Sequence, residues 1–259
     1  MFAVDLREHL CPVCQGSPAG KPWTAPYASV LQCSNCSHLY AASPATGQGM
    51  PPMPDTQAEL RLRSDQDRRL VRRWIDDGFV FPEVRVLDIG AGTGRLSQAI
   101  LDQVPARISC LEPEAQARAH LRRRGFDVVE TISEAGTVNA ILLIEVIEHV
   151  EDPVGLLRAC AAALAPSGRI FLTTPCGETT SGHRPMAGYR VPEHIQFFTE
   201  RSLRLACTNA GLHRLDFFPQ RLMRPPGRGA DRLVSVAKSC LRVVRDAVQG
   251  RHHFACYVS

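Results

Sequence analysis

Residues 85–97 have the sequence RVLDIGAGTGRLS, in which a short apolar run leads into a glycine-rich loop and then a helix-like stretch. Asp88 stands at the end of the apolar run, and three evenly spaced glycines follow it, Gly90, Gly92 and Gly94. Such a loop lets the backbone approach a bulky ligand at a helix N-terminus. A second apolar run at 107–112 ends in Glu112, whose carboxylate can accept both hydroxyls of a ribose. These two features together predict a nucleoside cofactor.

Strand-like and helix-like segments alternate from residue 85 onward. This alternation predicts an α/β fold with a mostly parallel sheet and helices on both of its faces. We expect strands at 85–90, 107–112, 127–130, 140–145, 169–175, 213–219 and 253–258, and helices at 95–103, 114–124, 153–165 and 200–210. An arginine-rich helix over 58–79 precedes them and is expected to cover the cofactor end of the core. Its arginines form either a solvated face or a phosphate-binding surface.

The string DIGAGTG at 88–94 places an acid ahead of evenly spaced glycines, unlike the G-x-G-x-x-G fingerprint of dinucleotide-binding folds. It resembles motif I of class I S-adenosylmethionine (SAM) methyltransferases. The resemblance continues through EVIEHVEDPVGLLRACAAALAPSGRIFLTTP at 145–175 and EHIQFFTERSL at 193–203, which look like the ubiquinone-type O-methyltransferases and their relatives. It covers most of 80–218 and implies a Rossmann-like, seven-stranded class I methyltransferase sheet whose last strand, here at 253–258, is antiparallel. The alternative is a glycine-rich turn in some other α/β enzyme.

The resemblance also implies which residues bind SAM. Asp88 is expected to hold the ammonium group, directly or through water, and Glu112 the ribose. Family members usually present a polar residue to the adenine after the third strand, where this chain offers Glu130 and Thr131. All of these positions lie at the carboxyl ends of strands, where open α/β sheets bind ligands. The expected cofactor-binding set is Asp88, Gly90, Ala91, Gly92, Gly94, Glu112, Thr131 and Ile144.

The segment EVIEH at 145–149 offers a first group for the chemistry. Glu145, Glu148 and His149 stand at i, i+3 and i+4, so they converge on one face if the segment enters a helical turn. The matching motif of the ubiquinone O-methyltransferases is implicated in binding magnesium, and a cation there would lower the pKa of a bound hydroxyl. The alternative is a hydrogen-bonded set that shapes the loop without a metal.

A second candidate is His194, which follows Glu193 in VPEHIQFFT. The pair resembles an active-site segment of sugar C-methyltransferases, enzymes that also carry an N-terminal zinc module. A histidine that is neutral near pH 7 is a suitable general base. The alternative is a histidine packed beside Phe197 and Phe198. The expected catalytic residues are Glu145, His149, Glu193 and His194.

Four of the ten cysteines form two C-x2-C pairs, namely Cys11 with Cys14 and Cys33 with Cys36. Two such pairs complete a tetrahedral zinc site, and four thiolates leave no open position for water, so we expect a structural zinc ion. His38 is a possible substitute ligand, with a packing role as the alternative. The other six cysteines stand singly in apolar surroundings and are expected to be buried as small hydrophobic residues, namely Cys110, Cys160, Cys176, Cys207, Cys240 and Cys256.

The chain is expected to divide into a zinc-ribbon-like module at 1–42, a Pro- and Gly-rich linker at 43–56 and a methyltransferase domain at 57–259. Within that domain, a helical insertion at 229–250 precedes the last strand. Its amphipathic helix, 231–248, is expected to pack on the sheet or on a second subunit, with peripheral contact to a membrane surface as the alternative.

Composition excludes few classes of function. The chain has 259 residues, 44% of them apolar, and a net charge of +4. No apolar run approaches the length of a membrane span, and the N-terminus lacks the layout of a signal peptide, so we expect a cytoplasmic protein. The expected activity is SAM-dependent methylation of a small-molecule acceptor. An RNA base methyltransferase is the first alternative, because one group of ribosomal RNA methyltransferases also carries a zinc module. A noncatalytic SAM-binding or scaffold protein is the second.

Overall fold

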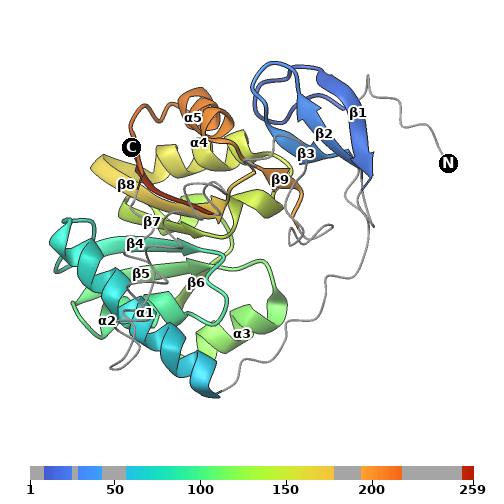
Figure 1. The fold of residues 1–259 in the computed structure, drawn as a ribbon. Helices are drawn as coiled ribbons and strands as arrows, with labels where there is room; N and C mark the ends of the chain where they lie inside the picture. Colours follow the sequence, from blue (N-terminus) through green and yellow to red (C-terminus); the bar gives the residue numbers. More distant parts are fainter. Residues whose placement is uncertain (1–8, 25–28, 43–56, 178–193, 218–252) are drawn as a thin grey trace, which may run out of the picture.

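The computed structural model describes residues 9–24, 29–42, 57–177, 194–217 and 253–259 (Figure 1). The expected linker at 43–56, the helical insertion at 229–250 and Glu193 lie outside these residues. The described chain forms a seven-stranded sheet with helices on both faces and a separate four-stranded sheet near the N-terminus. None of the helices in the described ranges is both long and apolar enough to cross a bilayer.

The seven-stranded sheet has the strand order β10-β11-β8-β7-β4-β5-β6. The five strands from β8 to β6 run parallel, and β11 lies antiparallel between β8 and β10. The expected fold class and the antiparallel last strand are therefore confirmed. The strands are β4 (Val84–Ile89), β5 (Ala106–Leu111), β6 (Asp127–Val129), β7 (Val138–Ile144), β8 (Leu164–Pro175), β10 (Leu215–Phe217) and β11 (His253–Val258).

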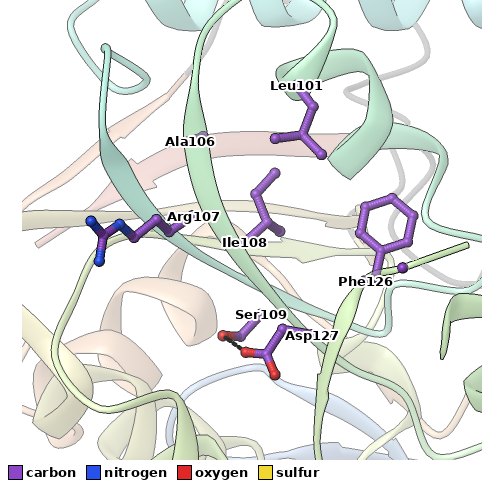
Figure 2. Close-up of a pocket in the computed structure, with 8 residues that line it drawn as sticks. Leu101, Ala106, Arg107, Ile108, Ser109, Phe126 and Asp127 are labelled. Atoms are coloured by element: carbon purple, nitrogen blue, oxygen red, sulfur yellow. Dashed lines mark hydrogen bonds between the residues drawn. The ribbon is translucent and has the colours of Figure 1, made fainter.

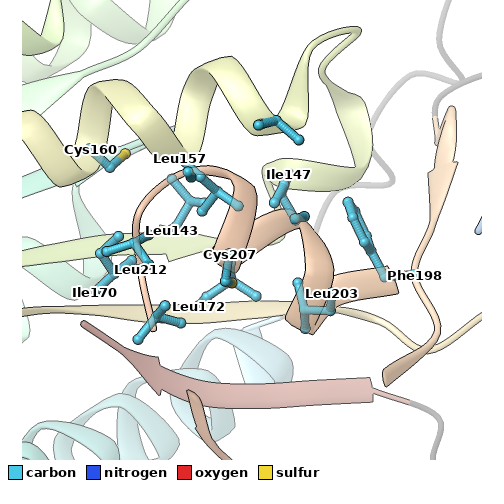
Figure 3. Packing of buried hydrophobic residues seen from close by; sticks show 14 of the residues in the cluster. Leu143, Ile147, Leu157, Cys160, Ile170, Leu172, Phe198, Leu203, Cys207 and Leu212 are labelled. Atoms are coloured by element: carbon cyan, nitrogen blue, oxygen red, sulfur yellow. The ribbon is translucent and has the colours of Figure 1, made fainter. Parts of the chain in front are cut away.

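Both faces of this sheet are covered, and residues 140–144 of the central strand β7 are apolar without interruption. Ala140 and Leu142 join the hydrophobic cluster that includes residues of α1 and α2, whereas Ile141 and Leu143 join the cluster that includes residues of α4 and α5. Figure 3 shows Leu143 among the residues of this second cluster. Continuous apolar runs of this kind are typical of parallel strands that are buried on both sides. The helices and short 3-10 turns are α1 (Gln57–Asp76), α2 (Arg95–Leu101), α3 (Ala115–Arg123), η2 (Ile132–Ala135), η3 (Ile147–His149), α4 (Pro153–Ala163) and α5 (Glu200–Asn209).

Local signals set the helix boundaries close to their expected places. Asp152 caps α4 by accepting a hydrogen bond from the Gly155 backbone N–H, and Pro153 occupies the first turn, where its missing N–H costs nothing. The helix ends two residues before the expected position, and β8 begins at Leu164, earlier than expected. Pro166 disfavours helical backbone at the residue before it, so the chain is already extended there.

The four-stranded sheet joins two distant parts of the chain. Its order is β1-β2-β3-β9, with β1 (Pro18–Thr24), β2 (Ser29–Cys33) and β3 (Leu39–Ala41) from the N-terminal region and β9 (Gln196–Phe197) from the region after β8. Leu39 pairs with Phe197 and Tyr40 with Gln196. The cysteine-rich segment is therefore hydrogen-bonded to the large domain, and most of its buried apolar residues belong to the same cluster as α4 and α5, whereas Val30 and Leu39 pack with Phe197.

Candidate active site and cysteine cluster

The glycine loop connects β4 to α2 through tight contacts that only glycine allows. Gly90 has a φ of 71°, and a Cβ atom there would lie 2.6 Å from Cγ2 of Val146. Gly94 has a φ of 74°, and its Cβ would lie 2.7 Å from Leu121 on α3. Both the left-handed backbone and the close packing therefore require glycine at these positions. The backbone of the loop lies at the carboxyl edge of the sheet, where a ligand can approach it.

Asp88 lies near the carboxyl end of β4 and is only 4% exposed. Its Oδ2 accepts a hydrogen bond of 2.7 Å from the hydroxyl of Ser97 on α2. Burial raises the pKa of Asp88 to about 6, the Ser97 hydrogen bond lowers it, and the nearby charge of Glu112 raises it further. A buried carboxylate of this kind is suited to a cationic ligand group, whose charge would compensate its desolvation.

Glu112 stands just after β5 and faces the same loop. Its Oε2 accepts a hydrogen bond of 2.7 Å from the Gly92 backbone N–H, and its Oε1 accepts one of 2.9 Å from the Glu114 backbone N–H. Each carboxylate oxygen has a second lone pair, so both can still accept a hydroxyl. The fixed orientation supports the expected ribose contact.

Two further expected cofactor residues lie at the same edge. Thr131 follows β6 and is exposed, with its hydroxyl donating to Glu134 over 3.1 Å. Ile144 ends β7 and is partly buried against the cluster beneath α1 and α2. The carboxyl ends of four neighbouring strands therefore present the expected set side by side, although the identity of the cofactor contacts stays a prediction.

Glu145 adopts a different position from the one that helical spacing predicts. Its φ is 53°, in the left-handed region, and the 3-10 turn η3 begins only at Ile147. Its backbone N–H donates to the Thr173 carbonyl, and its Oε1 accepts 2.7 Å from the Thr173 hydroxyl. Glu145 thus contacts β8, and its carboxyl group also interacts with that of Glu148, although it is not one of the three residues whose ligand atoms gather nearby.

That group consists of Glu148, His149 and His194, whose ligand atoms all lie within 4.8 Å of one another. The two imidazole rings meet edge to face with their centroids 4.7 Å apart. Glu148 is fully buried; its Oε2 accepts 3.0 Å from the Thr174 hydroxyl, and its Oε1 lies 4.0 Å from Nε2 of His149. Burial and the nearby Glu145 charge raise the pKa of Glu148 to about 8.

The donor set bears on which metal this group can accept. Among the described residues, Glu148 Oε1 is a buried polar atom that makes no hydrogen bond, which leaves it able to face a cation or a polar ligand. Two imidazoles and one carboxylate suit a transition metal better than magnesium, which prefers oxygen ligands. The structure thus groups His194 with Glu148 and His149, and the expected set of Glu145, Glu148 and His149 stays a prediction.

The four cysteines of the two C-x2-C pairs converge as expected. The Sγ atoms of Cys14 and Cys33 are 3.4 Å apart, those of Cys14 and Cys36 are 3.5 Å apart, and those of Cys11 and Cys36 are 3.6 Å apart. These separations are too long for disulfides. They are close to the value of about 3.8 Å between sulfurs that are each about 2.3 Å from one tetrahedral zinc ion. The four residues therefore fit a structural zinc ion.

The described residues line two cavities away from the glycine loop. One, of about 300 Å³, is lined by the amino-terminal half of β5 together with Leu101 at the end of α2, and by Phe126 and Asp127 at the start of β6 (Figure 2). The other, of about 190 Å³, lies between the cysteine-rich segment and the large domain. It is lined by His9, Leu10, Pro12, Tyr40, Ala41, Glu151, Ile195 and Gln196.

Sequence reasoning missed several polar residues around the site. Thr173 and Thr174 are buried near the end of β8. Two polar residues directly after an apolar run could have indicated a site from the sequence alone. His38 is fully buried and is not among the clustered thiols, which agrees with the packing alternative; burial lowers its pKa to about 4, with a hydrogen bond to Gln196 opposing the shift. Five of the six single cysteines are buried as expected, and Cys240 lies outside the described residues.

Comparison with known proteins identifies a family. The family model Methyltransf_23, described as a methyltransferase domain, matches residues 49–215. The ubiquinone biosynthesis O-methyltransferase of Xanthomonas axonopodis pv. citri is 37% identical over 102 residues, which cover 35% of this chain and 42% of that protein. The chain spans about two fifths of the length of the curated relatives it matches.

Solved structures show the same fold at low identity. A SAM-dependent methyltransferase from Archaeoglobus fulgidus is 16% identical, with a TM-score of 0.54 over 78% of this chain and 97% of that chain. The N-terminal domain of EvdMO1 with SAH bound is also 16% identical, with a TM-score of 0.51 over 82% of this chain and 90% of that chain. At these identities the likeness concerns the fold alone.

Proposed function

This chain belongs to the Methyltransf_23 family of methyltransferase domains, and on that premise we propose that it transfers the methyl group of SAM to a small-molecule acceptor. The observation that supports the proposal is the loop from Asp88 to Gly94. It begins at the buried carboxylate of Asp88, and its Gly92 backbone N–H donates a hydrogen bond to the carboxylate of Glu112. Asp88 could pair with the ammonium group of SAM, and Glu112, on the neighbouring strand, could accept the ribose hydroxyls.

The residues that follow β7 and those that precede β9 would then bind and deprotonate the acceptor. When bound, SAM supplies an electrophilic methyl group on sulfur. His194 would accept the proton that the acceptor loses as its oxygen, nitrogen or carbon bonds to that methyl. His149, in edge contact with His194, would orient that ring. Glu145 and Thr173 would fix the turn on which His149 stands. Glu193 stays a predicted contributor from outside the described residues.

We also propose a structural zinc ion held by Cys11, Cys14, Cys33 and Cys36, because their sulfur separations fit a tetrahedral site and four thiolates leave no room for substrate. The segment itself contributes few apolar residues to the shared core, so the metal would supply much of its folding free energy. The reduced cluster supports a cytoplasmic location.

A magnesium site stays a prediction of the sequence. The ligands expected for it are Glu145, Glu148 and His149. The donor set favours the alternative without magnesium, in which the buried Glu148 carboxyl orients the histidines.

The deciding experiment is direct. SAM binding is measured by titration calorimetry, and SAM consumption is then followed with a metabolite extract and with total RNA as separate acceptor pools. Mass spectrometry should find a gain of one methyl group in a small molecule. Methyl gain confined to RNA would support the nucleic-acid alternative, and SAM binding without any methyl gain would support the noncatalytic one.

A further inference from the structure

His38 is a buried histidine that joins the cysteine-rich segment to the large domain. It is fully buried between β2 and β3, and its ring lies 4.6 Å from that of Phe198. Nε2 of His38 is 2.8 Å from Oε1 of Gln196, and Nδ1 is 3.2 Å from the hydroxyl of Ser202 on α5. Both ring nitrogens therefore face residues of the large domain that lie more than 150 positions away.

The direction of these hydrogen bonds follows from their partners. Nε2 of Gln196 donates to the Val150 carbonyl over 2.9 Å. A carbonyl can only accept, so the amide nitrogen of Gln196 must face Val150 and its oxygen must face His38. His38 therefore carries its proton on Nε2 and donates it to Gln196, which leaves Nδ1 to accept from Ser202.

Gln196 thereby connects two loops that carry proposed catalytic residues. Val150 immediately follows His149, and Gln196 stands two residues after His194. A second link lies between them, because the Ile195 backbone N–H donates to the Glu148 carbonyl over 2.9 Å. The Ile195 carbonyl in turn accepts from the Ala41 backbone N–H over 2.9 Å, so the cysteine-rich segment contacts this junction by both backbone and side chain.

We propose that His38 is a positioning residue, which through Gln196 fixes the two loops that place His149 and His194 beside each other. This inference rests on the proposed methyltransferase function, since it assigns the cysteine-rich segment a part in arranging that site. His38 touches neither cofactor nor acceptor in this scheme. Its effect passes through the amide of Gln196 to the backbone of both loops.

The test compares variants that remove the hydrogen bonds but keep the volume. His38→Phe retains an aromatic ring against Phe198, and Gln196→Leu retains the bulk of the amide; the double variant completes a cycle. The measured quantity is the amide hydrogen exchange of Ile195, followed by NMR. His38→Gln, which can still donate to the Gln196 oxygen, is the rescue variant. Gln32→Ala, an exposed change on β2, is the matched control.

We expect Ile195 exchange to accelerate about tenfold or more in each single variant, because a buried partner loses its hydrogen bond. The double variant should exchange no faster than the singles, since both changes break one chain of bonds. His38→Gln should return exchange toward the wild-type rate, and the control should not change it. SAM affinity should stay within about twofold in all variants, because the glycine loop is untouched.

Unchanged Ile195 exchange in His38→Phe would overturn the proposal. Additive effects in the double variant would also overturn it, because they would show that His38 and Gln196 act independently. Equal acceleration at amides of β8 would overturn it as well, because it would indicate a general loss of packing. Formation of SAH with the metabolite extract is a second readout, and it should fall in His38→Phe and recover in His38→Gln. If the wild-type protein bound no SAM, the proposed function would fail while the exchange result would still decide whether His38 fixes the two loops.

Discussion

Replacing Asp88 by Asn should make the protein more stable at neutral pH while weakening its binding of SAM. Burial raises the pKa of Asp88 from 3.8 to about 6 in the folded chain. The folded state therefore holds this proton more tightly than the unfolded state does. The contribution of the group to stability is complete below pH 4 and is lost as the pH rises to about 6.

The magnitude follows from the size of the shift. A difference of about 2.2 pKa units corresponds to about 3 kcal/mol of unfolding free energy lost at pH 7.5. Asn at this position carries no charge and keeps an acceptor for the Ser97 hydroxyl. The variant should thus exceed the wild type by up to about 3 kcal/mol at pH 7.5 and by only about 1 kcal/mol at pH 4.5.

Urea unfolding at the two pH values measures this difference, with Asp102→Asn, an exposed carboxylate just after α2, as the control. Titration calorimetry gives the second half of the prediction. Loss of a charge-assisted hydrogen bond to the SAM ammonium, worth about 1.5 to 3 kcal/mol, should weaken binding by about 10- to 150-fold. A stability gain that is the same at both pH values, or wild-type SAM affinity in the variant, would refute the reasoning.

Four further changes test the rest of the site. Glu112→Ala should weaken SAM binding by at least about tenfold in calorimetry, because it removes the ribose acceptor, and should lower the melting temperature somewhat, because the Gly92 and Glu114 N–H groups lose their acceptor; wild-type affinity would exclude Glu112 from the cofactor site. Cys33→Ser should reduce the zinc content, which we expect to be about one ion per chain in metal analysis, and should unfold the cysteine-rich segment while SAM still binds; full zinc retention would contradict the four-thiolate site. His194→Ala should lower turnover by about 10²- to 10⁴-fold with little change in SAM affinity and should remove an inflection near neutrality from the pH profile; unchanged turnover would reduce His194 to a packing role. Treatment with a chelator too weak to remove a four-thiolate zinc ion should leave turnover unchanged, because Glu148 orients the histidines without magnesium; a loss that Mg²⁺ restores would establish the magnesium site.

The sequence predicted those parts of the site that depend on neighbouring residues. Asp88, the glycine loop and Glu112 were predicted at the carboxyl edge because each directly follows or ends an apolar run, and parallel strands bring such ends together. The mostly parallel sheet was predicted from the alternation of strand-like and helix-like segments, and its seven strands from the family resemblance. Most expected strand boundaries were within one or two residues, whereas β8 begins five residues early, next to Pro166, which disfavours helical backbone at the residue before it.

Long-range pairing and unusual backbone could not be predicted. The expected helical turn does not begin at Glu145, whose left-handed φ lets its side chain contact Thr173 as well as Glu148. His194 joins Glu148 and His149 because the segment that leads into β9 is hydrogen-bonded to η3, a contact that no local periodicity encodes. The bond between His38 and Gln196 spans 158 residues, and a single sequence contains no signal for a partner so distant.

The pairing of β3 with β9 also has a consequence for the order in which the chain folds during synthesis. Leu39 leaves the ribosome 158 residues before its partner Phe197. At about 5 to 20 residues per second, roughly 8 to 30 seconds pass before that partner exists. Through this interval β3 is the open edge of an incomplete sheet, a type of edge that readily pairs with other chains. Early zinc capture by the nascent chain would hold the two cysteine pairs together while translation supplies the missing strand.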